Sequence, residues 1–133
     1  MRAIRWALVP VVAVVAWAAA LFVGLLLHDV AMRLCPAAQM VSGLCVAPWW
    51  PYAEAAVFCT SAAIAAASIV IASSLTAPSG RARVAATVYA AGVVWAVWLV
   101  IPGTAIEEYL FLACAVAAGG WAVWWIRRRP NRT

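Results

Sequence analysis

The sequence predicts an all-α membrane protein: four transmembrane helices in an antiparallel bundle, with the N- and C-termini on the cytoplasmic side. Three observations support this fold class. First, 69% of the 133 residues are hydrophobic and only 10% are charged, whereas soluble domains are roughly 45–50% apolar and about 25% charged. Second, four apolar runs are long enough to cross a bilayer. Third, the basic residues gather at alternate ends of these runs.

The four expected spans are separated by proline and glycine, and together they form a single domain over residues 1–133. A spanning helix needs about 20 mostly apolar residues, and the spans are expected at about residues 6–27, 52–75, 84–101 and 109–126. Pro51 suits the first turn of the second helix, where a missing N–H costs nothing. Residues 77–80 and 102–104 break the later runs. Outer loops are therefore expected at 28–51 and 102–108.

The first span has features of a signal peptide. Arg2 and Arg5 form a basic start, and the small residues at 16–18 could be a cleavage site. The apolar run, however, continues through residues 21–27. We therefore expect this segment to remain as a transmembrane helix.

The arginines predict the orientation, because basic residues flanking a span mark the cytoplasmic side. Four crossings place eight arginines on one side: Arg2, Arg5, Arg81, Arg83, Arg127, Arg128, Arg129 and Arg132. The other side has Arg33, with Asp29, Glu107 and Glu108. The abundance of alanine, together with arginine as the only strong base, suggests a GC-rich bacterial genome. The expected location is therefore the bacterial cytoplasmic (inner) membrane, as a multi-pass protein.

Small residues recur through the last three spans and predict close helix packing. Inside lipid, helices associate by van der Waals contact, and small side chains let their backbones approach. The short connections favour antiparallel neighbours, with a left-handed bundle as the default geometry. The expected partners are the lipid bilayer and either other membrane subunits or further copies of this chain. Nucleic acid is not expected, because the basic residues lie beside apolar spans.

The four cysteines fall into two pairs. Cys35 and Cys45 lie in the first outer loop, and two thiols in an oxidising compartment usually pair, so we predict a disulfide. Cys59 and Cys114 lie inside the second and fourth spans, in the outer half and at similar depth. They are either small apolar fillers or a redox pair that exchanges electrons with the loop pair.

Polar residues gather at the expected outer mouth: His28, Asp29, Glu54, Glu107 and Glu108. In one interpretation, Glu54, Glu107 and Glu108 each occupy a helix's first turn and complement its dipole. In the other, His28, Glu54 and Glu107 or Glu108 form a metal or proton site, with Asp29 orienting the imidazole. Such a site of one imidazole and several carboxylates would suit a divalent metal.

No catalytic or cofactor motif is present: there is no HExxH, CxxC, Gly-rich phosphate loop or Gly-x-Ser-x-Gly turn. No cofactor is therefore predicted. The helix count and two loop cysteines resemble quinone-linked disulfide-forming oxidoreductases, but the CxxC and a cysteine in 102–108 are missing. Small multidrug exporters also have four helices, but depend on an acid within the first, which has none here. No family is assigned.

Three functional hypotheses follow. The first is a non-enzymatic accessory or assembly subunit of a larger membrane complex, which agrees with the missing motifs and the small-residue helix surfaces. The second is a small oligomeric transporter or ion- or metal-handling protein that uses the outer-mouth carboxylates. The third is a membrane thiol–disulfide oxidoreductase that uses all four cysteines.

Overall fold

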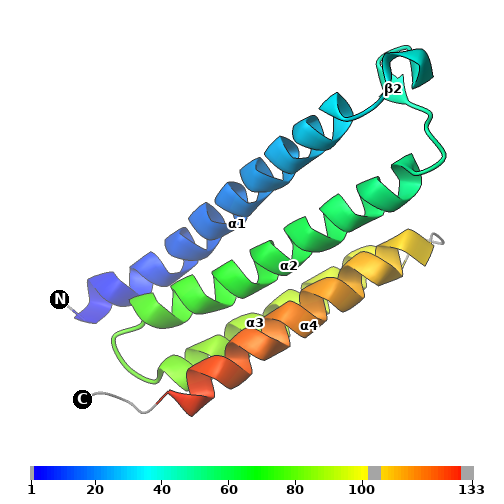
Figure 1. The fold of residues 1–133 in the computed structure, drawn as a ribbon. Coiled ribbons are helices and arrows are strands. Elements are labelled where there is room, and N and C mark those ends of the chain that lie inside the picture. The colour runs from blue at the N-terminus through cyan, green and yellow to red at the C-terminus, as the bar shows by residue number, and fades with distance from the viewer. Residues whose placement is uncertain (1, 102–105, 130–133) are drawn as a thin grey trace.

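The computed structural model describes residues 2–101 and 106–129, and helices make up most of this part of the chain (Figure 1). The helices are α1 (Arg2–Arg33), α2 (Trp50–Thr76), α3 (Arg81–Val100) and α4 (Ile106–Arg128). All four are long and apolar enough to cross a membrane, which confirms the prediction of four candidate transmembrane helices.

The helices extend beyond the predicted apolar runs, most of all at the end of α1. The predicted end at residue 27 is wrong, because α1 continues to Arg33. The extra turns are stabilised locally. Arg33 Nη2 lies 2.8 Å from Asp29 Oδ2, and Ala31 and Met32 pack against a buried cluster that includes Trp50. The first outer loop is consequently shorter than 28–51, and His28 and Asp29 lie within α1 rather than at its end.

The loop between α1 and α2 has a small fold of its own. After the 3-10 turn η1 (Ala37–Gln39), strands β1 (Met40–Val41) and β2 (Leu44–Cys45) pair antiparallel. The tight turn between them holds Ser42 and Gly43 at φ values of 51° and 80°. Positive φ at both central residues is typical of two-residue hairpin turns. The hairpin occupies one end of the molecule (Figure 1).

The second helix lies at the centre of the structure. α2 packs against α1, α3 and α4, and α3 also packs against α4, whereas α1 makes no comparable contact with α3 or α4 in the described part of the chain (Figure 1). The buried residues Val70, Ala85, Ala122 and Val123 form a core shared by α2, α3 and α4. The main core therefore joins three helices, and α1 lies against the outside of α2.

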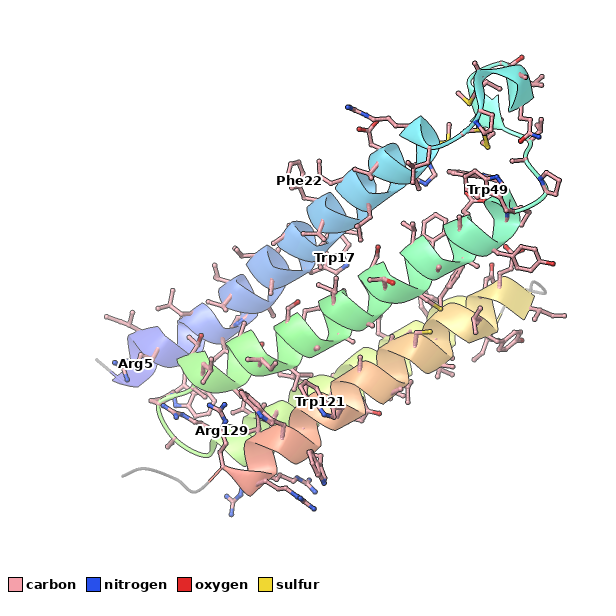
Figure 2. The ribbon with its side chains drawn as sticks, in the orientation of Figure 1. Arg5, Trp17, Phe22, Trp49, Trp121 and Arg129 are labelled. Carbon is pink, nitrogen blue, oxygen red and sulfur yellow. A yellow bond between two sulfur atoms is a disulfide. The ribbon has the colours of Figure 1, made fainter. Side chains whose placement is uncertain are left out.

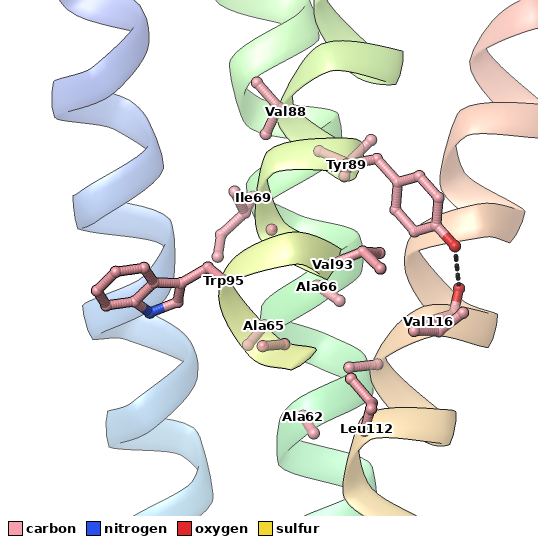
Figure 3. Close-up of a pocket in the computed structure, with 14 residues that line it drawn as sticks. Ala62, Ala65, Ala66, Ile69, Val88, Tyr89, Val93, Trp95, Leu112 and Val116 are labelled. Carbon is pink, nitrogen blue, oxygen red and sulfur yellow. Dashed lines mark hydrogen bonds between the residues drawn. The ribbon is translucent and has the colours of Figure 1, made fainter. Parts of the chain in front are cut away.

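Glycines mark the closest helix approaches. A Cβ added to Gly24 of α1 would lie 2.7 Å from Ser61 Oγ of α2. A Cβ added to Gly119 of α4 would lie 2.8 Å from the Tyr89 ring of α3. The Tyr89 hydroxyl also donates a hydrogen bond to the Val116 carbonyl of α4, at 3.1 Å (Figure 3). Packing of this kind, with small residues at the contact, is expected between membrane helices.

The start of α1 and the end of α4 lie at the same end of the molecule, opposite the hairpin (Figure 1). Figure 2 shows Arg5 and Arg129 near this end and Trp49 near the other. The ends of α2 and α3 nearest the 77–80 turn also lie at the arginine end, so Arg81 and Arg83 join it.

Candidate functional site

The loop cysteines form the predicted disulfide. Cys35 and Cys45 are bonded, with Cα atoms 6.0 Å apart. Cys45 ends β2 and is buried with Ala47 and Trp50, while Cys35 packs against the same cluster. The disulfide therefore joins the end of α1 to the hairpin, and the packing of Cys45 on Trp50 joins the hairpin to the start of α2.

The membrane thiols are neighbours across the α2–α4 contact. Cys59 and Cys114 are both free and half-buried, and Cys59 lies against the turn of α4 that precedes Cys114. The Cys59 thiol also faces the Leu110 carbonyl oxygen of α4, at 3.9 Å. Beside them, the rings of Phe58 and Phe111 lie 5.4 Å apart, centroid to centroid. The sequence predicted similar depths for the two thiols, but only the structure places them at the same α2–α4 contact.

The thiol pair and the disulfide are separated along the axis of α2. Both thiols lie in the third turn of their helices, about 12–14 Å from the helix starts at 1.5 Å per residue. Cys45 precedes the start of α2. Direct exchange between the two pairs would therefore require a rearrangement of the loop or of the helix ends.

His28 packs among aromatic side chains. Its ring centroid lies 5.6 Å from that of Trp50 and 6.3 Å from that of Phe58. Its buried Nδ1 atom has no hydrogen-bond partner. Asp29 was expected to orient this imidazole, but its carboxylate pairs with Arg33 instead. The expected Asp29–His28 pair is therefore wrong, because the helix continues and places Arg33 one turn beyond Asp29.

Glu54 was expected in the first turn of the second helix, and this is wrong. α2 begins at Trp50, with Pro51 in its first turn as predicted, so Glu54 lies in the second turn. It is spaced by one turn from both Trp50 and Phe58, the residues that contact His28. The half-buried Glu54 is thus on the α2 face that meets α1, but no hydrogen bond or ion pair of 4 Å or less joins Glu54 to His28.

Glu107 and Glu108 occupy the first turn of α4, as predicted. This position complements the positive end of the helix dipole. Glu107 is exposed, whereas Glu108 is half-buried and its Oε2 atom has no hydrogen-bond partner. Within residues 2–101 and 106–129, no three His, Cys, Asp or Glu residues are arranged to hold a metal ion. The outer-mouth residues are therefore spread over three helices rather than joined in one cluster.

An apolar cavity of about 280 Å³ lies between α2, α3 and α4 (Figure 3). Ala62, Ala66, Val93 and Leu112 are among its lining residues, and Tyr89 contributes its polar hydroxyl. Sequence analysis missed this role of Tyr89, although a tyrosine in the middle of an otherwise apolar span was a usable signal. The cavity has no charged lining residue, so it suits only an apolar occupant.

Gly92 of α3 also lines this cavity. It is exposed in the middle of α3, and a Cβ added there would meet nothing within 4 Å. Ala90 and Ala91 beside it are exposed as well.

Comparisons with known proteins give no relative. The chain matches no protein-family model, and no curated protein or solved structure is significantly similar to it.

Proposed function

We propose that this chain is a four-pass protein of the bacterial cytoplasmic membrane that serves as a non-enzymatic accessory or assembly subunit of a larger membrane complex. Four apolar helices and the common location of the start of α1 and the end of α4 support an antiparallel arrangement with both termini on one side. Arg5, Arg81, Arg83 and the arginines that end α4 favour the cytoplasm for that side.

Gly92 carries the proposal of a partner. A glycine inside a helix costs about 1 kcal/mol relative to alanine, and it is useful where another backbone approaches closely. Nothing in the described chain lies near the position of its missing Cβ. Gly119 and Gly24, in contrast, are each matched by a close contact within the chain. A helix of another membrane subunit, or of a second copy, explains the exposed small residues at 90–92.

Crosslinking in native membranes tests this proposal. We expect a crosslinked complex that Gly92→Leu disrupts, because the larger side chain holds the partner helix away. Ala18→Leu is the matched control, since Ala18 is a small exposed residue on α1, and it should leave the complex intact. A chain that stays monomeric in native membranes, or one whose complex survives Gly92→Leu, would contradict the proposal.

The proximity of Cys59 to Cys114 across the α2–α4 contact favours a second candidate function, a membrane thiol–disulfide oxidoreductase. In this reaction the two membrane thiols form a disulfide and release two electrons and two protons. These reduce the Cys35–Cys45 disulfide to two thiols. The exchange runs through a mixed disulfide, so the loop pair has to approach the membrane pair from its place beyond the start of α2.

The redox state of the loop pair separates the two functions. Cys59→Ser and Cys114→Ser should shift the ratio of reduced to oxidised Cys35–Cys45 in membranes if all four cysteines exchange electrons. This ratio is measured by alkylating free thiols before and after reduction and determining the mass of the intact protein by mass spectrometry. An unchanged ratio in both variants removes the oxidoreductase function and leaves the thiols as packing residues.

A further inference from the structure

A small polar pocket lies at the arginine end of the helices, away from the cysteines and the acidic residues. Its volume is about 70 Å³. It forms where the end of α2 and the start of α3 meet the end of α4. Two guanidinium groups and a serine line it together with aromatic and aliphatic side chains: Arg81, Arg129, Ser74, Trp125, Ala82, Ile71, Leu75 and Ile126.

The two arginines approach the pocket from different helix ends. Arg81 is the first residue of α3, so the positive end of the α3 dipole adds to its charge. Arg129 directly follows α4, and its guanidinium carbon lies 3.5 Å from the centre of the Trp125 ring. Stacking on an aromatic ring restricts the guanidinium plane and leaves its N–H groups free to bind an anion.

No carboxylate in the described chain pairs with these arginines. The one ion pair found there joins Arg33 to Asp29 near the hairpin. Glu54, Glu107 and Glu108 lie near the other ends of α2 and α4. Within residues 2–101 and 106–129, the pocket therefore combines two positive groups with no carboxylate to balance them.

We infer that this pocket binds the phosphate of an anionic phospholipid, such as phosphatidylglycerol. Guanidinium groups bind phosphate oxygens in paired, planar geometry. The pocket lies at the ends of three candidate spans, where lipid headgroups meet the helices. Ile71, Leu75 and Ile126 provide an apolar wall for the lipid below its phosphate. The inference relies on the membrane location in the proposed function, but not on the orientation or on a protein partner.

Lipid retention tests the inference. The purified full chain is incorporated into vesicles of phosphatidylcholine with phosphatidylglycerol, extracted gently, and examined by native mass spectrometry. We expect the protein to retain phosphatidylglycerol in preference to phosphatidylcholine. Replacing both pocket arginines, Arg81→Gln with Arg129→Gln, should weaken retention about thirtyfold, as expected for the loss of two guanidinium–phosphate contacts of about 1 kcal/mol each.

The matched control is Arg83→Gln with Arg127→Gln. It removes the same charge from exposed arginines that do not line the pocket, and it should retain phosphatidylglycerol as the unmodified chain does. Equal loss in the pocket and control variants would overturn the inference, because general attraction to the anionic surface would then explain retention. Equal retention of the two lipids would overturn it too.

Ala82→Glu provides a variant that keeps both arginines. It places a carboxylate in the pocket lining, at a first-turn position where an acid stabilises the helix. We expect lost lipid retention with unchanged or higher thermal stability in phosphatidylcholine. Retention that survives Ala82→Glu would overturn the inference.

Inorganic phosphate is added as a competitor, and binding as tight as that of the lipid would assign the pocket to free phosphate instead. Insertion into phosphatidylcholine vesicles alone checks the membrane location separately.

Discussion

Tyr89 joins α3 to α4 through two contacts that constrain each other. Its ring lies against Gly119, where any added Cβ would come within 3.0 Å of two ring carbons. Its hydroxyl donates to the Val116 carbonyl at 3.1 Å. The ring therefore cannot move away from residue 119 without lengthening or breaking this hydrogen bond.

Gly119→Ala should consequently destabilise the protein. The added methyl group collides with a ring that is held at its far end, and overpacking of this kind costs about 1–3 kcal/mol. Unfolding by a denaturing detergent in mixed micelles measures the change. Gly92→Ala is the control, because a Cβ there meets nothing and alanine favours the helix by about 1 kcal/mol. Equal effects of the two substitutions would refute this account of the contact.

Tyr89→Phe removes the hydroxyl and keeps the ring. We expect a loss of about 0.6–1.5 kcal/mol in unfolding free energy, the usual range for one such hydrogen bond. The same micelle titration detects it. Combining Tyr89→Phe with Gly119→Ala should then cost less than the sum of the single changes, because the freed ring can shift. Strict additivity would show that the two contacts are independent.

Side-chain pairings within one loop could be predicted from the sequence. Pairings between helices could not, because they depend on how each helix is rotated about its own axis. The Cys35–Cys45 disulfide was predictable because both thiols lie in one short loop. The proximity of Cys59 to Cys114 was not predictable, since equal depth does not determine which faces of α2 and α4 meet. Asp29 was assigned to His28 because they are adjacent, but in a continuing helix its neighbour one turn away, Arg33, lies closer.

Among the helices, α1 depends on its contact with α2. Gly24 and Ser61 are at the closest approach, and the Ser61 hydroxyl is held in place by a 2.7 Å hydrogen bond to the Val57 carbonyl. Ala20 of α1 is also buried. The opposite side of α1 is exposed, as Phe22 illustrates in Figure 2. Small residues therefore set the closest approach of α1 to α2, and His28 and Met32 add larger contacts near the hairpin.

Gly24→Ala should weaken that attachment by about 1–2 kcal/mol, since the added Cβ would lie 2.7 Å from Ser61 Oγ. Adding Ser61→Ala should restore part of the loss by removing the oxygen. A double-mutant cycle on unfolding free energies measures the coupling. A coupling energy of zero would show that Gly24 and Ser61 do not meet at the closest approach of α1 and α2.

The disulfide should stabilise the hairpin end of α1 and α2. Closing a loop of about ten residues is worth about 2–3 kcal/mol in the chain-entropy model. Replacing Cys35 and Cys45 with serine should lower the unfolding free energy by that amount and speed amide exchange from Ala31 to Trp50. Exchange within α3 is the internal control and should not change. Faster exchange throughout the protein would instead show that the disulfide is needed for the whole fold.

Element number and position were predictable because four apolar runs admit few other solutions in lipid. The residues at which the helices end were harder to predict. The end of α1 was placed at residue 27, before the first polar residue, but the helix continues to Arg33 and stops where the chain turns into the hairpin. The pairing of β1 with β2 was not foreseen, because strands of two residues have no periodic pattern.

At the scale of the whole molecule, the charge distribution gives a test of orientation. Arg5, Arg81, Arg83 and the arginines ending α4 share one end of the structure. If that end is cytoplasmic, alkaline phosphatase fused after Thr133 should be inactive, and a fusion placed in the hairpin turn at Ser42 should be active. The reverse pattern would invert the proposed topology, and activity of both fusions would exclude an even number of crossings.

The central place of α2 has a consequence for how the protein is made. α2 is the second helix to leave the ribosome, and it contacts each of the other three. α1 therefore waits for one helix only, and α4 finds its main neighbour, α2, already translated when it emerges. α3 can pack on α2 at once and gains α4, the next helix in the chain, immediately afterwards. Assembly can follow the order of synthesis, and no helix has to be kept apart until a distant partner is translated.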